Sequence, residues 1–169
     1  MMVQELSILK RVNLQNKIKM IYWLTGQPGH GKTTLAKIFK EYLENNYSHK
    51  KIMHIDGDDL REVFNNKDYS KEGRIKNITF AQGLAKYLNM KGFDVIVSLV
   101  APYKEVRESF KTDMGSELTE IYVHTEELRG REANHVSDYE KPTEKFIDID
   151  TTNIEPIGSL LEMINQIQL

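Results

Sequence analysis

Eight consecutive residues, Gly26–Thr33, have the types and the spacing that bind a chain of phosphates. They read Gly-Gln-Pro-Gly-His-Gly-Lys-Thr and fit the P-loop pattern G-x-x-x-x-G-K-[ST]. Because glycine has no Cβ atom, such a loop can turn sharply and direct successive backbone N–H groups at one point. Lys32 adds a positive charge for the β- and γ-phosphates, and the Thr33 hydroxyl is an oxygen ligand for Mg²⁺.

The residues around this loop supply the elements that the motif needs. A short apolar stretch, 19–25, has strand character, and apolar residues recur at helical spacing from Leu35 to Leu43. A strand, a glycine-rich loop and a helix in this order predict ATP as ligand and Mg²⁺ as its cofactor. The alternative interpretation of the same residues is a glycine-rich turn that merely caps a helix and binds neither. The residues expected to bind ATP here are Gly26, Gly29, His30, Gly31, Lys32, Thr33 and Thr34.

Three carboxylates and an arginine occur within six residues, Asp56–Arg61, after the second expected strand. One interpretation is an Asp-Gly turn in which Asp59 caps the next helix. Another places Asp58 beside the γ-phosphate, where it binds Mg²⁺ through water or orients and deprotonates an attacking hydroxyl. The residues expected to carry the catalysis are Lys32, Asp58 and Asp56, with Thr33 and Asp58 at the metal ion.

Further polar side chains follow the other strands. Arg74 and Asn77 are three residues apart and share a helix face, which suits an anionic ligand, and Tyr69 could stack on a base. Arg129 and Arg131 follow the fourth expected strand, where they could neutralise charge at the ATP phosphates. The ordinary alternatives are a surface salt bridge for Arg74 and core packing for Tyr69. For Arg129 and Arg131 the alternative is a charged helix surface.

Apolar strands alternate with helical patterns along the chain. The expected strands are Ile18–Leu24, Lys51–Ile55, Asp94–Val100, Thr119–His124 and Lys145–Ile149. The expected helices are Lys32–Asn45, Asp59–Phe64, Arg74–Lys91, Glu105–Met114, Glu126–Asn134 and Pro156–Gln168. This alternation predicts an α/β, three-layer P-loop NTPase fold with a five-stranded parallel sheet, and ligands at the carboxyl ends of the strands. Residues 1–17 are interpreted as an N-terminal extension and residues 18–169 as one P-loop domain.

The composition argues against several other classes of protein and site. The net charge of −2 shows no basic excess for a nucleic-acid groove, and no apolar run approaches the ~18 residues that a membrane helix needs. Cysteine is absent, which excludes disulfides, thiolate zinc sites and cysteine nucleophiles. The N-terminus lacks the features of a signal peptide. We therefore expect a cytoplasmic protein with no nucleic-acid and no membrane partner.

The order of the motifs resembles that of the adenylylsulfate kinases (APS kinases). The P-loop is followed by Asp-Gly-Asp-x-x-Arg, Tyr-Ser-x-x-x-Arg-x-x-Asn, x-Pro-Tyr-x-x-x-Arg, Asp-Tyr-Glu-x-Pro and Ile-Asp-Thr-Thr, so the resemblance runs from about Met20 to Leu169. It implies a kinase domain that transfers the γ-phosphate of ATP to the 3′-hydroxyl of adenosine 5′-phosphosulfate (APS), giving PAPS and ADP, in sulfate assimilation or activation. Members of the family are often dimers, which implies a homodimer as the assembly to test.

The resemblance also implies roles for single residues. Gly26–Thr34 would hold the ATP phosphates, and Asp58 would lie at Mg²⁺ and at the reacting 3′-hydroxyl. Tyr69 stands where the family has an aromatic residue, usually Phe, that stacks on the substrate adenine. The residues that the resemblance implies for substrate binding are Arg61, Tyr69, Arg74, Asn77, Val100 and Arg107.

Two departures from the family pattern bear on the substrate. Ala101 stands where many members have a phosphorylatable serine, so no phosphoserine role is implied. The lid looks short, because Arg129–Ser137 runs almost directly into Asp138–Pro142 without the usual Lys-Gly-Leu-Tyr and Phe-Thr-Gly segments. A lysine contact and a second stacking aromatic would be lost, unless His135 or Tyr139 takes the aromatic's place.

The short lid leaves three functions open. A lost stacking partner costs roughly 1–3 kcal/mol of base binding, which is about tenfold or more in affinity. APS is the leading acceptor, and with a stacking partner lost it would bind more weakly. The alternatives are a kinase for another nucleotide-linked small anion in surface-polymer biosynthesis, and a catalytically weak homologue that binds ATP.

Overall fold

The computed structural model of the chain describes residues 19–169, which fold around a five-stranded parallel sheet with the strand order β2-β3-β1-β4-β5. The strands are β1 (Ile21–Thr25), β2 (Lys51–Asp56), β3 (Phe93–Ser98), β4 (Leu118–His124) and β5 (Phe146–Asp150). The sequence prediction of a five-stranded parallel sheet is confirmed. The predicted N-terminal extension, residues 1–17, lies outside the described residues, as does residue 18.

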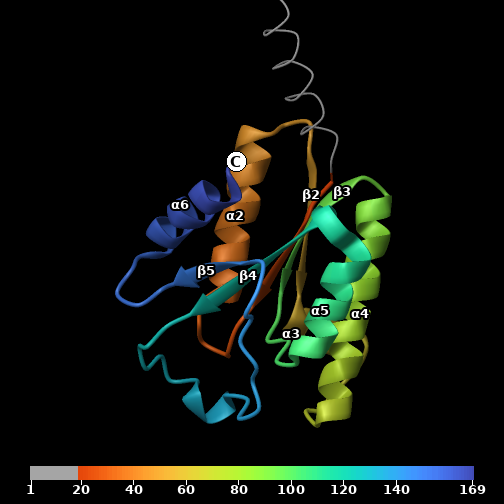
Figure 1. Cartoon of the computed structure of the whole chain (residues 1–169), viewed down its shortest axis with the longest axis vertical. Helices are drawn as coiled ribbons and strands as arrows, with labels where there is room; N and C mark the ends of the chain where they lie inside the picture. The colour runs from red at the N-terminus through yellow and green to blue at the C-terminus, as the bar shows by residue number, and fades with distance from the viewer. Residues whose placement is uncertain (1–18) are drawn as a thin grey trace, which may run out of the picture.

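Helices cover both faces of the sheet, as Figure 1 shows. α2 and α6 pack on one face and contact each other, whereas α4 and α5 cover the other face with α3 beside α4. The helices are α2 (Lys32–Asn46), α3 (Gly57–Val63), α4 (Lys71–Met90), α5 (Lys104–Met114) and α6 (Pro156–Ile167), with short 3₁₀ turns η1 (Gly115–Glu117) and η2 (Glu132–Asn134). This is the predicted three-layer α/β arrangement. No helix in the described range 19–169 is both long and apolar enough to span a bilayer.

β1 leads directly into the P-loop and is buried on both faces. Tyr22 and Leu24 belong to the core under α2 and α6, whereas Ile21 and Trp23 belong to the core under α4 and α5. All four side chains are at most 2% exposed. Burying a large apolar side chain stabilises a fold by about 1.5–3 kcal/mol, so the loop starts from a rigid base.

A buried carboxylate joins three strands at their amino ends, the end of the sheet opposite the P-loop. Asp94, near the start of β3, is inaccessible to solvent. It accepts a 2.7 Å hydrogen bond from the backbone N–H of Met20, just before β1, and a 2.6 Å bond from Lys50 Nζ, just before β2. The beginnings of β1, β2 and β3 are therefore held together by one side chain.

The predicted helix Glu126–Asn134 is wrong. This segment is a loop whose only helical part is η2. Leu128 is 86% exposed, and Gly130 has φ +76°, a left-handed conformation that interrupts a right-handed helix. The segment is rich in charged helix formers but has no apolar stripe to bury, and burial of such a stripe supplies most of a helix's stability.

Two helices begin two or three residues earlier than predicted because other side chains cap them. α3 begins at Gly57, since the Asp56 carboxylate accepts a hydrogen bond from the backbone N–H of Asp58 at 2.9 Å. The prediction that Asp59 caps this helix is therefore wrong. α4 begins at Lys71, since Ser70 Oγ accepts a hydrogen bond from the backbone N–H of Gly73.

Candidate functional site

The P-loop leaves β1 at Gly26 and ends where α2 begins. Gly26 has φ +152°, and a Cβ atom there would lie 2.1 Å from the backbone oxygen of Val123 in β4. Only glycine therefore fits between the two strands at this point. The loop then delivers the N-terminus of α2, with its unpaired N–H groups and its dipole, to the carboxyl end of the sheet.

Lys32 is the cation of this loop. Its side chain is 7% exposed, and Nζ donates a 2.8 Å hydrogen bond to the backbone oxygen of Gln27. Burial lowers the pKa of Lys32 to about 8, although Asp56 and Asp58 favour the charged form. An ammonium group with so little solvation is ready to bind a multiply charged anion.

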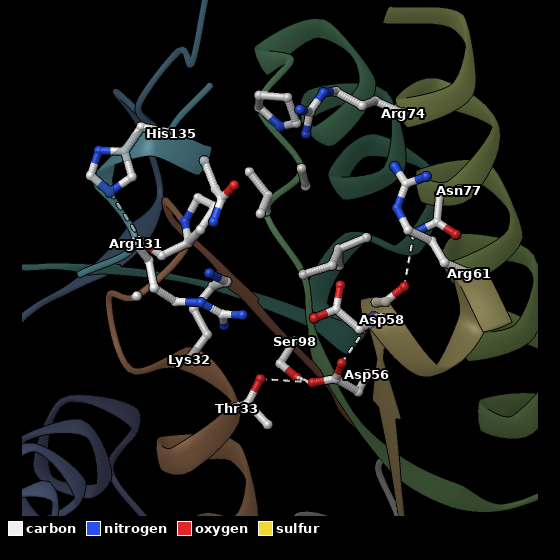
Figure 2. Close-up of a pocket in the computed structure, with 18 of the residues that line it drawn as sticks. Lys32, Thr33, Asp56, Asp58, Arg61, Arg74, Asn77, Ser98, Arg131 and His135 are labelled. Carbon is white, nitrogen blue, oxygen red and sulfur yellow. Dashed lines mark hydrogen bonds between the residues drawn. The ribbon is translucent and has the colours of Figure 1, made fainter. Parts of the chain in front are cut away.

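A chain of hydrogen bonds fixes Asp56 at the end of β2. Asp56 Oδ2 accepts hydrogen bonds from Thr33 Oγ1 at 2.7 Å and from Ser98 Oγ at 2.8 Å, as Figure 2 shows. Because the Ser98 proton is used in this way, His54 Nε2 must donate to Ser98 Oγ across the 2.8 Å between them. Burial alone would raise the pKa of Asp56, but the hydrogen bonds that it accepts hold this pKa below its usual value.

The donor atoms suit Mg²⁺ carried by a nucleotide. Thr33 gives its only hydroxyl proton to Asp56, which leaves the oxygen lone pairs free for a cation, and the Asp58 carboxylate lines the same cavity. In residues 19–169 no cluster of three or more His, Cys, Asp or Glu side chains could hold a metal alone. Mg²⁺ typically takes one or two protein ligands and completes its shell with phosphate and water, so the residues present fit it.

A second cationic group lies across the cavity from the P-loop. The Arg61 guanidinium lies over the Tyr69 ring, 4.2 Å from its centroid, and donates hydrogen bonds to the backbone oxygens of Asn66 and Asp68. Arg74 Nε donates to the backbone oxygen of Tyr69 at 2.9 Å. Neither arginine pairs with a carboxylate within the described part of the chain, so both charges are available to an anion.

Asn77 lies deeper in this second group. Its side chain is 4% exposed, and Nδ2 donates a 3.1 Å hydrogen bond to the backbone oxygen of Gly57. Asn77 Oδ1 is buried and has no partner among the described residues. Since an unmatched buried oxygen costs free energy, this atom suits a ligand that donates a hydrogen bond.

One cavity of about 740 Å³ joins the two groups. Figure 2 shows Lys32 and Arg131 on one side, Arg61 and Arg74 on the other, and Asp58 between them. The predicted site residues that line it are Gly29, Gly31, Lys32, Thr33, Thr34, Asp56, Asp58, Arg61, Tyr69, Arg74, Asn77, Val100 and Arg131. Four cationic side chains against two carboxylates make the cavity positive in a chain whose net charge is −2. A cavity of this kind concentrates anions such as nucleotides.

The segment 131–136, which we call the strap, lies against the P-loop and belongs to the lid that the sequence predicts to be short. The backbone N–H of Asn134 donates to the oxygen of Arg131, and that of His135 donates to the oxygen of Glu132, so the strap contains one tight turn. His135 Nε2 donates to the backbone oxygen of Pro28 at 3.1 Å. Four strap residues line the cavity: Arg131, Ala133, Asn134 and His135. The His135 imidazole is the aromatic ring among them, and that it replaces the second stacking residue stays a prediction.

Arg107 does not lie in the cavity, which corrects the expectation that it completes the substrate pocket. Its side chain is about 1% exposed and forms an ion pair with Glu120, with 2.8 Å between Nε and Oε1. It also donates to the backbone oxygens of Ala101 and Glu140. Ala101 lines the cavity with φ +41°, a conformation that a non-glycine residue rarely adopts. Arg107 therefore supports the cavity wall from behind.

Three other predicted residues also lie outside the lining. Gly26 contacts β4, as described above, and His30 is 8% exposed, where burial lowers its pKa to about 4 and keeps it neutral. Arg129 pairs with Glu127 and donates to Thr151. The predicted contacts of these residues with ATP stay predictions.

Tyr139, considered as a replacement aromatic, points instead to Thr25, with 2.9 Å between the two hydroxyl oxygens.

The sequence did not single out Ser98 or Gln27. Ser98 ends β3, next to β2 in the sheet, and this position at the carboxyl end of a strand was the available signal. Gln27 occupies a variable position of the P-loop pattern, and its role depends on the strap, more than 100 residues later. Nothing local marks it.

The sequence of this chain is similar to those of known kinases. A family model described as adenylylsulphate kinase matches residues 18–152. A cytidine diphosphoramidate kinase from Campylobacter jejuni is 34% identical over 130 residues, which cover 76% of this chain and 74% of that protein. A probable adenylyl-sulfate kinase from Pyrococcus abyssi is 32% identical over 155 residues, covering 79% of this chain and 86% of that protein.

The fold is also that of a solved structure. The APS kinase of Mycobacterium tuberculosis, solved in complex with AMPPNP and APS, superposes with a TM-score of 0.75 at 20% identity. The superposition covers 89% of this chain and 98% of that chain.

Proposed function

Because this chain belongs to the adenylylsulfate kinase family, we propose that it transfers the γ-phosphate of Mg·ATP to a ribose hydroxyl of a nucleotide that carries a small anion at its 5′ end. APS, with transfer to its 3′-hydroxyl to give PAPS and ADP, is the first acceptor to test. The observation that carries this proposal is the single cavity with two cationic groups and Asp58 between them. A simple nucleotide switch has no use for the second group.

The reaction proposed is an in-line displacement. The hydroxyl oxygen of the acceptor attacks the γ-phosphorus, the bond from that phosphorus to the ADP oxygen breaks, and the hydroxyl proton leaves to Asp58 or to water. Lys32 and the N–H groups of the P-loop stabilise the charge on the β- and γ-phosphates. Bound Mg²⁺, held by Thr33 and Asp58 together with the phosphates, would supply further charge neutralisation.

The acceptor would be held by the second group. Arg61 and Arg74 are oriented by hydrogen bonds to backbone oxygens, so their guanidinium groups need little ordering when an anion binds. Asn77 Oδ1 would accept a hydrogen bond from a sugar hydroxyl. Holding both reactants in one orientation is the main contribution that such an enzyme makes to the rate.

A second candidate acceptor is a cytidine nucleotide such as cytidine diphosphoramidate. Two observations favour it: the 34% identity to a cytidine diphosphoramidate kinase, and a strap without a large aromatic side chain at the cavity. A purine gains more from stacking between two rings than a pyrimidine does, because its ring system is larger. A site that offers the Tyr69 ring and only the smaller imidazole of His135 therefore favours adenine less strongly than a site with two large rings would.

The test is to incubate the protein with Mg·ATP and either APS, cytidine diphosphoramidate or no acceptor, and to identify the product by mass. Phosphorylated APS supports the first candidate, and phosphorylated cytidine diphosphoramidate supports the second. ATP binding without any phosphorylated nucleotide would contradict both and identify a catalytically weak homologue. Lys32→Ala is the matched control for product that arises from a contaminating kinase.

A further inference from the structure

Gln27 connects the P-loop to the strap. Its side chain meets the backbone of Val136 twice: Nε2 donates to the Val136 oxygen at 2.8 Å, and the Val136 N–H donates to Oε1 at 2.9 Å. A glutamine amide has the same donor and acceptor as a peptide group, so it pairs with Val136 as a neighbouring strand would. Val136 itself is only 6% exposed, which shields both hydrogen bonds from water.

The same residue also holds Lys32. The backbone oxygen of Gln27 accepts the hydrogen bond from Lys32 Nζ, at 2.8 Å. One residue of the P-loop is therefore linked through its main chain to one cation of the cavity and through its side chain to the segment that carries another, Arg131.

The strap is short enough to transmit this link. Its turn joins Arg131 to Asn134 by a backbone hydrogen bond, and His135, the next residue, donates to Pro28. The Arg131 side chain lies beside the P-loop, with its Cβ atom 3.1 Å from the place where a Cβ atom on Gly29 would be. Figure 2 shows its guanidinium beside Lys32. Arg131 pairs with no carboxylate of residues 19–169.

We propose that Gln27 is a positioning residue, whose side-chain amide fixes the strap on the P-loop so that Arg131 stands at the transferring phosphate. This inference rests on the proposed function for its kinetic consequence, since Arg131 acts there on a phosphoryl group. A displaced cation loses much of its effect, because the stabilisation of developing charge depends on groups that are already in place.

Hydrogen exchange tests the structural half of this proposal. Gln27→Ala removes both hydrogen bonds to Val136, so the strap amides that donate hydrogen bonds, those of Asn134, His135 and Val136, are expected to exchange at least about tenfold faster. Gln166→Ala is the matched control, because Gln166 is an exposed glutamine on α6 whose amide donates to the oxygen of Asp148, away from the cavity. Unchanged exchange of the strap in Gln27→Ala would overturn the proposal whatever the activity of the enzyme.

A double-mutant cycle tests the kinetic half. Gln27→Ala is expected to lower kcat roughly tenfold to hundredfold with a smaller change in the KM for ATP. In an Arg131→Ala background, the same substitution is expected to change kcat by less than about twofold, because the residue through which Gln27 acts is gone. An equal loss in both backgrounds would contradict the proposal.

A second variant guards against simple loss of the fold. Gln27→Glu keeps the length of the side chain but replaces the Nε2 donor by an oxygen that faces the Val136 oxygen, so it is expected to release the strap like Gln27→Ala. A Glu variant with normal strap exchange and normal kcat would contradict the inference. If the wild-type protein phosphorylates no nucleotide offered, the proposed function fails, whereas the exchange measurement still decides whether Gln27 holds the strap.

Discussion

Lys32 and Asp58 face the same cavity, but their replacement is expected to have different effects. Lys32→Ala should lower kinase activity by at least about hundredfold, because no other cation of the loop reaches the β- and γ-phosphates. The fold should persist, because burial already disfavours the Lys32 charge in the folded protein. Turnover and circular dichroism of the same sample check this prediction, and wild-type turnover would refute the role of Lys32.

Asp58→Asn should instead lower kcat by about 10²–10⁴ and leave the affinity for ATP within a few fold. Asparagine keeps the size of the side chain but cannot accept the hydroxyl proton in the transition state. Steady-state kinetics combined with ATP binding by calorimetry make the distinction. An increase in KM at constant kcat would make Asp58 a binding residue.

Which site residues could be predicted depended on how local their signal is. The P-loop residues and Asp58 belong to short motifs whose chemistry needs those types at those spacings, and most of them line the cavity. Arg107 looked equally suitable, but an arginine on a helix does not tell which neighbour it will meet. Its partner, Glu120, comes from a different element, so only the fold reveals that Arg107 forms a buried ion pair inside the protein.

At the scale of elements, Arg107 joins α5 to β4 and to the cavity wall. Arg107→Ala is expected to lower the free energy of unfolding by about 3 kcal/mol, because it leaves the buried Glu120 carboxylate with Lys111 as its remaining partner. Lys86→Ala, which removes an exposed ion pair with Asp113, should cost less than about 1 kcal/mol. Urea unfolding of both variants provides the comparison. Equal losses would show that burial of the Arg107 pair has no special weight.

The elements were predictable wherever an apolar pattern had a partner to bury it. The five strands and the helices around them follow the periodicity of the sequence, with ends displaced by a few residues through capping. Glu126–Asn134 failed because charge and helix propensity alone cannot hold a helix, and Leu128 stays 86% exposed. The strap, which begins inside this segment, is held by Gln27 and Pro28, and these contacts span more than 100 residues of sequence.

At the scale of the whole molecule, ATP should stabilise the fold, because its site requires β1, β2 and α2 to be in place together. At a concentration of 100 times Kd, a ligand of the native state adds about 2.7 kcal/mol. For a chain of this size that corresponds to a rise in Tm of roughly 5–10 °C. Thermal unfolding with and without Mg·ATP measures it. The same rise in Lys32→Ala would show that the nucleotide binds elsewhere.

The buried Asp94 has a consequence for the reacting groups far from it. β2 and β3 each have six residues, in a register that pairs Lys51 with Phe93 at one end and Asp56 with Ser98 at the other. Asp94 lies four residues before Ser98, so at ~3.3 Å per residue a carboxylate roughly 13 Å below the cavity helps to fix the position at which each strand places its last side chain. A substitution of Asp94 would therefore shift the ends of β2 and β3, and with them Asp56 and Ser98, although none of the residues that line the cavity is changed.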